Sequence, residues 1–234
     1  MKDLIPLLDK LRLTGIKTHL LEIEEHPVDS SYNLLKNLLE IEYEYKKSRS
    51  LHYRLILAKL PTIKLLSETS QSKLVESIDI KHLIDNKENI ILVGGSGSAK
   101  THLAIGLTFA AIQKSYRAKF YTLNELAILL LNAREYNNEI RFMEVIKRFD
   151  IIVVDELGYV PIKAESQPLL FELFAKLYEQ TSIIITTHLR FEEWGEIFGN
   201  AKATKAIIDR LTHHCKIIET GNESFRGGSN VNVK

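Results

Sequence analysis

Two short stretches of this 234-residue chain combine residue types that bind phosphate and activate water. The first, residues 90–101, reads IILVGGSGSAKT: an apolar run, a turn rich in glycine and serine, and then Lys100 and Thr101 opening a helix. Small residues let successive backbone N–H groups surround a phosphate, and a helix start adds partial positive charge. In this pattern Lys100 is suited to reach the β- and γ-phosphates of a nucleotide, and the Thr101 hydroxyl is suited to bind Mg²⁺.

The turn departs from the phosphate-binding loop GxxxxGK[ST] at Ala99, where the pattern has glycine. If that position requires a positive φ, alanine costs roughly 1–2 kcal/mol, which is about tenfold in affinity. The alternative is an ordinary turn between a strand and a helix, but the order strand, turn, helix favours a phosphate loop. The residues expected to contact nucleotide are Gly94, Gly95, Ser96, Gly97, Ser98, Ala99, Lys100, Thr101 and His102.

The second stretch, residues 151–156, reads IIVVDE and predicts a buried strand that ends in two carboxylates. Asp155 is suited to hold Mg²⁺ through water, and Glu156 is suited to orient and deprotonate an attacking water. Many strands end in acidic residues that only face solvent. The interpretation of Asp155 and Glu156 as functional therefore depends on the phosphate loop that the same chain contains. The apolar run 118–121 lies between the two motifs. A strand there, with Glu directly after Asp, suits hydrolysis better than small-molecule phosphorylation.

Two further positions are candidates for the same site. Residues 183–188 (IIITTH) predict another buried strand whose end, at Thr187 or His188, reaches the γ-phosphate or the lytic water. The alternative is a strand that simply runs into a loop. Arg210 lies on a predicted helix and is suited to act on the γ-phosphate of a neighbouring subunit. Taken alone, however, an arginine on a helix is more often a solvated surface residue.

The elements that must position these residues follow an alternating pattern. Short β-rich runs alternate with helical patterns, which is typical of an α/β fold with a parallel sheet. We expect strands at 90–93, 118–121, 151–154, 183–187 and 216–219, and helices at 100–113, 124–134, 139–148, 167–179 and 203–213. Continuous apolar runs indicate strands buried on both faces. The fold class predicted is therefore an α/β P-loop fold with a parallel five-stranded sheet flanked by helices.

The first part of the chain shows no strand alternation and predicts a small all-helical unit. Apolar residues at 4, 7, 8 and 11 have helical spacing, a capped helix is expected at 32–45, and another at 49–59 must end near Pro61. We therefore expect a helical N-terminal domain at 1–67, a linker at 68–87, a nucleotide-binding core at 88–226 and a disordered tail at 227–234.

Composition excludes several classes of protein. The charge balance of 31 Lys and Arg against 30 Asp and Glu argues against a uniformly basic surface for nucleic acid. One cysteine excludes an internal disulfide and fits a reducing compartment, so a cytoplasmic location is expected. We find no signal peptide and no apolar run long enough to cross a membrane, so no membrane partner is expected.

A local basic stretch nevertheless lies between residues 45 and 67, with six Lys and Arg and no Asp or Glu. The DNA-binding candidates in it are Lys46, Lys47, Arg49, Arg54 and Lys59; a weaker set is Arg141, Lys147 and Arg148. Contact with double-stranded DNA through phosphates should tolerate any sequence. The alternative is a solvated helix face.

These motifs, with DELGY, FEEWGEIFG, IIDRLTHH and ESFR after them, resemble the IstB/DnaC-like branch of the AAA+ ATPases over about residues 4–226. Within that branch the chain most resembles the IstB-like ATP-binding helpers of insertion-sequence transposition. The resemblance implies binding of ATP and Mg²⁺, a homo-oligomer on DNA, and delivery or activation of a transposase. It also implies that Arg210 is an arginine finger and that Arg226 is a terminal nucleotide contact.

Two departures leave alternatives open. Ala99 replaces the loop glycine, and His188 stands where the family usually has an asparagine that positions the lytic water. Histidine still donates a hydrogen bond, but its size and tautomer differ. The alternatives to a transposition helper are a DnaC-like loader of a replicative helicase and a nucleotide-binding scaffold with impaired hydrolysis.

Overall fold

The computed structural model describes residues 5–22, 31–68 and 71–221, and every structural statement below concerns these residues. Contacts divide the chain into two compact units, Met1–Tyr53 and Arg54–Lys234. No helix in the described ranges combines the length and the apolar character that crossing a membrane requires. The predicted domain limits, with a linker at 68–87, concern which parts of the chain fold independently, and they stay a prediction.

The first unit is helical, with α1 (Ile5–Lys10), α2 (Thr14–Glu22) and most of α3 (Ser31–Ala58). The side chain of Glu42, buried under α2, accepts the N–H of Ile16 at 3.0 Å. The sequence predicted two helices at 32–45 and 49–59, and this was wrong: α3 is continuous, because no glycine or proline interrupts residues 45–49. The helix ends as expected, at Ala58, where Lys59 turns to a φ of 51° ahead of Pro61.

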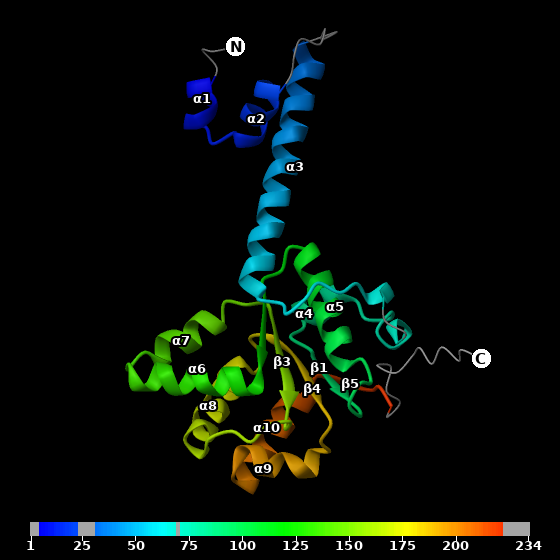
Figure 1. Ribbon diagram of the computed structural model, residues 1–234, viewed down its shortest axis with the longest axis vertical. Helices are drawn as coiled ribbons and strands as arrows, with labels where there is room; N and C mark the ends of the chain where they lie inside the picture. The colour runs from blue at the N-terminus through cyan, green and yellow to red at the C-terminus, as the bar shows by residue number, and fades with distance from the viewer. Residues whose placement is uncertain (1–4, 23–30, 69–70, 222–234) are drawn as a thin grey trace, which may run out of the picture. The chain divides into compact units, whose positions relative to one another are not determined.

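The second unit contains a parallel five-stranded sheet in the order β2-β3-β4-β1-β5 (Figure 1). The strands are β1 (Asn89–Val93), β2 (Ala118–Thr122), β3 (Ile151–Leu157), β4 (Ser182–Thr187) and β5 (Cys215–Glu219). All five lie where the apolar runs predicted them, so the fold class is confirmed. The strand between β1 and β3 in the sheet is β4, whereas β2, which lies between them in the chain, forms an edge.

Helices cover both faces of this sheet. The helix α5 (Lys100–Gln113) covers one face, and α6 (Leu123–Glu135), α8 (Gln167–Leu177), α9 (Gly195–Phe198) and α10 (Ala201–His213) enclose the main apolar core on the other (Figure 1). The short α7 (Glu139–Ile146) packs on α6. Ile90, Ile91 and Leu92 of β1 are fully buried, as continuous apolar runs predicted. At the edge, β5 is an exception, since half of Ile217 is exposed.

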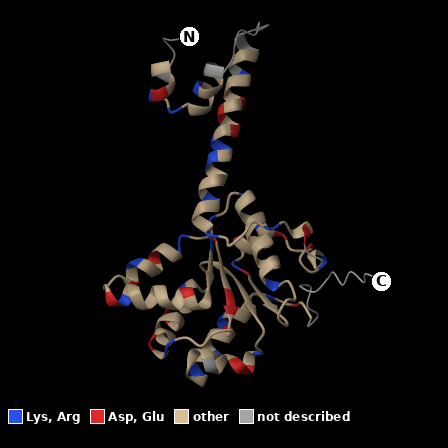
Figure 2. Ribbon diagram, in the orientation of Figure 1, with Lys and Arg blue, Asp and Glu red and all other residues tan. Residues whose placement is uncertain are grey.

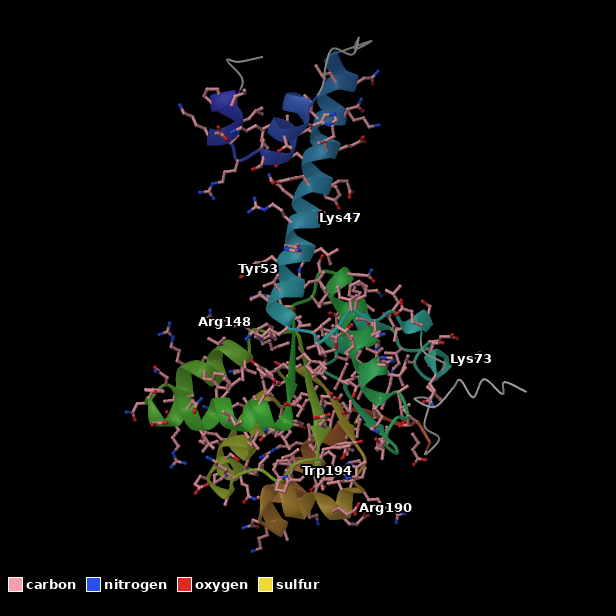
Figure 3. The ribbon with its side chains drawn as sticks, in the orientation of Figure 1. Lys47, Tyr53, Lys73, Arg148, Arg190 and Trp194 are labelled. Carbon is pink, nitrogen blue, oxygen red and sulfur yellow. The ribbon has the colours of Figure 1, made fainter. Side chains whose placement is uncertain are left out.

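Short elements close the remaining edges. The helix α4 (Ile80–Asp85) packs on α5, with Ile80, Leu83 and Ile84 buried, so the segment expected to be a linker contains a buried helix. Single 3-10 turns lie at η1 (Leu66–Glu68), η2 (Ser72–Leu74), η3 (Ala164–Ser166) and η4 (Phe191–Trp194). The indole of Trp194 is fully buried in the main core (Figure 3).

Candidate functional site

The glycine- and serine-rich turn joins β1 to α5 at the carboxyl edge of the sheet. Its first N–H, at Gly94, donates to the Thr187 carbonyl of β4 at 3.1 Å. The Ser98 and Thr220 hydroxyls lie 2.7 Å apart, which ties the far side of the turn to the chain after β5. Neighbouring strand ends therefore hold the loop in shape, as phosphate binding by backbone groups requires.

Ala99 occupies the position where the loop pattern has glycine, and its backbone is left-handed. With φ 63° and ψ 11°, Ala99 is the N-cap of α5, and its carbonyl accepts the N–H of Leu103 at 2.9 Å. This position therefore has the positive φ that was considered for the loop glycine. The conformation costs an alanine about 1–2 kcal/mol, and this strain lies at the start of α5.

Lys100 places its ammonium inside the loop. The residue is 5% exposed, and its Nζ donates to the carbonyls of Gly94 at 2.8 Å and Gly95 at 2.6 Å. A buried cation surrounded by backbone groups is suited to bind phosphate oxygens. The side chain of His102, two residues after Lys100, is exposed to solvent.

Thr101 and Asp155 lie side by side although they belong to different elements. The Thr101 hydroxyl donates to the carboxylate of Asp155, at 3.0 Å from Oδ1 and 3.2 Å from Oδ2. The hydroxyl of Thr186 on β4 also donates to Oδ1. A hydroxyl and a carboxylate at one point are the oxygen ligands that Mg²⁺ prefers, so these residues fit the ion that the sequence predicts.

Burial raises the pKa of Asp155 above its ordinary value of 3.8, and the hydrogen bonds from Thr186 and Thr101 act against this shift. A raised pKa means that the folded chain holds the proton more tightly than the unfolded chain. The contribution of this group to stability is therefore lost as the pH rises through the window above 3.8. A cation beside the carboxylate would reverse that effect.

Glu156 lies at a bulge in β3. Val154 pairs with Ile185 and Leu157 pairs with Thr187, so β3 carries one extra residue at this point. Glu156 has a φ of 60° and an exposed side chain, and its N–H donates to the Thr186 hydroxyl at 3.0 Å. Asp155 is therefore buried while the next carboxylate is exposed to solvent, where a water can reach it.

His188 follows β4 directly, and its ring meets Tyr159 edge-on, with 4.3 Å between ring centroids. Thr187, the other candidate from the sequence, is fully buried and donates to the Leu157 carbonyl at 2.8 Å, so it does not face the loop. Sequence reasoning missed Thr186 and Tyr159. The available signal for Thr186 was its position as the first of the two threonines that end the apolar run.

Arg210 contacts α8 and does not contact the phosphate-binding loop. Its guanidinium carbon lies 5.7 Å from the ring centroid of Phe171, and Nη1 is buried with no hydrogen-bond partner among the described residues. The structure therefore does not join Arg210 to Lys100 within one chain. Arg226 and the tail at 227–234 lie outside the described residues.

The DNA-binding candidates lie on α3 and directly after it. Lys46 is 3.3 Å from Glu42 and Lys47 is 3.3 Å from Glu44. Arg49, Arg54 and Lys59 have no ion pair in the described part of the chain. Of the weaker set, Arg141 is on α7 and Lys147 and Arg148 follow it; Lys147 is 3.7 Å from Glu144.

Solved structures share the fold of the second unit. The DnaC helicase loader aligns with a TM-score of 0.52 and 16% identity, covering 68% of this chain and 92% of that one. DnaA from Aquifex aeolicus, bound to AMPPCP, aligns with a TM-score of 0.55 and 19% identity, covering 69% of this chain and 51% of that one. These similarities show that the sheet and its helices share the fold of those two proteins.

Sequence comparison is more specific. A protein of Pseudomonas aeruginosa described as an insertion sequence IS21 putative ATP-binding protein is 31% identical, over 97% of this chain and 89% of its own. Its counterpart for IS5376 in Geobacillus stearothermophilus is 36% identical, over 82% of this chain and 79% of its own. A family model described as "IstB-like ATP binding protein" matches residues 7–232. The chain therefore belongs to the IstB-like family of ATP-binding proteins, P-loop ATPases of the AAA+ class.

Proposed function

We propose that the chain is the ATP-dependent, DNA-binding helper ATPase of an insertion sequence, which oligomerises on DNA and recruits or activates a transposase. The observation that carries this proposal is the position of Thr101 and Asp155, side by side at the loop that buries Lys100. That arrangement suits a nucleotide triphosphate with its metal ion. The relatives described as ATP-binding proteins of insertion sequences supply the biological setting.

Binding of ATP would use groups that the fold already gathers. Backbone N–H groups of the turn after Gly95 would surround the phosphates, and the Lys100 ammonium would exchange the carbonyls of Gly94 and Gly95 for phosphate oxygens. Thr101 and Asp155 would hold Mg²⁺, which when bound neutralises charge on the phosphates.

Hydrolysis would use groups on adjacent strand ends. Glu156, exposed at the bulge of β3, would orient and deprotonate the attacking water. His188, directly after β4, would donate a hydrogen bond to that water or to the γ-phosphate. Because Arg210 makes its contacts on α8, it would act on the nucleotide of a neighbouring subunit, so a complete site would need two chains.

DNA contact is proposed for α3. Lys46 and Lys47 have side chains more than half exposed, and Lys47 and Tyr53 extend into solvent (Figure 3). Figure 2 shows lysines and arginines along this helix. Their partners Glu42 and Glu44 belong to the same helix. Lys46 is exposed but pairs with the buried Glu42. The Lys47–Glu44 pair is exposed on both sides, and such pairs are worth little, so phosphates would compete for Lys47. Such contacts add affinity without reading sequence.

Sedimentation velocity tests this function. We expect the wild-type chain with duplex DNA, ATP and Mg²⁺ to form DNA-bound oligomers that persist in Glu156→Gln, because that variant binds ATP but does not cleave it. Lys100→Ala should remain monomeric. A wild-type chain that stays monomeric on DNA with ATP overturns the proposal. Binding to a replicative helicase in place of a transposase would assign the chain to the helicase loaders instead.

A further inference from the structure

The loops that follow β3 and β4 are fastened to each other by one buried hydroxyl. The Oγ1 of Thr187 donates to the Leu157 carbonyl at 2.8 Å and accepts the N–H of Leu189 at 3.0 Å. Thr187 is fully buried, so water does not compete for these bonds. The two loops therefore keep one relative placement next to the phosphate-binding turn, whose first N–H donates to the carbonyl of the same Thr187.

The backbone of Gly158 allows an even closer approach. It has a φ of +90°, and a Cβ built there would lie 2.1 Å from Cδ1 of Leu189. Any other residue would push the loops apart, so this position requires glycine on both grounds. The N–H of Tyr159 donates to the Glu156 carbonyl at 3.2 Å, which closes a tight turn that begins at the proposed catalytic base.

This turn places the Tyr159 ring near two groups of the proposed ATP site. The ring meets the His188 ring edge-on, with a centroid distance of 4.3 Å and an interplanar angle of 65°. The Lys100 ammonium lies 5.9 Å from the same ring centroid. One aromatic ring therefore touches the residue after β4 and approaches the lysine that opens α5.

We propose that Tyr159 is a positioning residue that sets the imidazole of His188 for ATP hydrolysis; this inference rests on the proposed function. An exposed histidine at a strand end otherwise has several rotamers, and an edge-to-face contact selects one of them. The ring of Tyr159 is such an orienting neighbour for the imidazole of His188.

The expected signature is a loss of turnover without a loss of binding. Tyr159→Leu should lower kcat for ATP about tenfold, because reacting groups lose alignment, while affinity for a fluorescent ATP analogue changes less than about twofold. Tyr159→Phe keeps the ring and should retain wild-type kcat. Tyr136→Leu, which changes a tyrosine that is 72% exposed at the end of α6, is the matched control and should change neither quantity.

A double-mutant cycle separates positioning from a structural role. His188→Ala should lower kcat about as much as Tyr159→Leu, and the double variant should be no slower than His188→Ala. Fully multiplicative losses would overturn the proposal. So would a Tyr159→Leu variant that lowers only the thermal stability or only the affinity for nucleotide.

Nuclear magnetic resonance of the histidine rings provides a readout that does not need turnover. Addition of a non-hydrolysable ATP analogue with Mg²⁺ should shift the His188 ring signals in wild type, and by less than half as much in Tyr159→Leu. Equal shifts in both overturn the inference. Failure to oligomerise on DNA would overturn the proposed function and leave the measurement of the His188 ring signals interpretable, because it concerns one chain and its nucleotide.

Discussion

The hydroxyl of Thr101 lies 3.0 Å from Oδ1 of Asp155, although 54 positions separate the two residues in the chain. The contact exists because α5 begins at the same edge of the sheet at which β3 ends. Ligands in such sheets bind beyond the carboxyl ends of the strands. This contact marks the point at which the nucleotide and its metal ion are proposed to bind.

Asp155→Asn tests the cost of that buried carboxylate. Without nucleotide, at pH 8, we expect the variant to be more stable than wild type by about 1 kcal/mol, because a buried charge is removed. Mg²⁺ and ATP should raise the melting temperature of wild type but not of the variant. Thermal unfolding with and without ligand measures both effects. The exposed Asp209→Asn is the control, and a ligand response retained in Asp155→Asn would contradict the metal assignment.

Thr186→Val should be strongly destabilising. Its hydroxyl accepts the N–H of Glu156 and donates to Asp155, so valine leaves both buried groups without that partner. We expect a loss of about 2–3 kcal/mol in the free energy of unfolding by urea. Thr186→Ser keeps the hydroxyl and should lose less than half as much. A Thr186→Val variant that loses no more than Thr186→Ser would contradict the role given to the hydroxyl.

Ala99→Gly should stabilise the chain. The left-handed backbone at Ala99 costs an alanine about 1–2 kcal/mol, and glycine avoids this strain at some cost in chain entropy. We expect a net gain of about 1 kcal/mol in denaturant unfolding. The same change at Ala110, inside α5, should instead cost about 1 kcal/mol. Destabilisation by both changes would contradict the conformation of the loop.

Binding of DNA through phosphates predicts a specific salt dependence. Changing Lys47 and Arg49 to alanine together should weaken duplex binding at every sequence and lower the slope of log K against log salt by about 2, one for each lost contact. Fluorescence anisotropy at several salt concentrations measures this. Lys73→Ala, which removes an exposed cation on η2, is the control (Figure 3). An unchanged slope in the double variant would place the DNA elsewhere.

The single cysteine provides a probe of the fold. Burial raises the pKa of Cys215 to about 12. Because the thiolate is the reactive form, alkylation by iodoacetamide at pH 8 should be at least about 100-fold slower in the native chain than in urea. The native rate should then rise as the pH increases toward 12. Equal rates in the native and the unfolded chain would contradict the packing of β5 against β1.

The sequence predicted those features that depend on local pattern. The apolar runs located all five strands, and α5 begins at Lys100 as the turn before it indicates. The glycine in the loop pattern raised the condition of a left-handed backbone at Ala99, and the structure meets that condition. In each case neighbouring residues determine the outcome, because alternation, capping and positive φ are short-range properties.

Features that depend on distant contacts could not be predicted. Chain order does not show that β4 separates β1 from β3, and a threonine in a buried strand does not show that it bridges the two sides of a bulge. The contact of Tyr159 with His188 joins the ends of two strands, and the side chain of Leu189 packs against the bare backbone of Gly158 beside it. The helix α3 is continuous because its sequence contains no helix breaker. The prediction of two helices rested on periodicity and did not take this into account.

Measurement of ATP hydrolysis with and without duplex DNA tests the central claim most directly. The account predicts that DNA accelerates hydrolysis by the wild-type chain, since DNA would bring Arg210 of one subunit to the nucleotide of the next. It also predicts that Glu156→Gln lowers the DNA-stimulated rate at least about 100-fold. A rate that is the same with and without DNA, or that Glu156→Gln leaves unchanged, would contradict it.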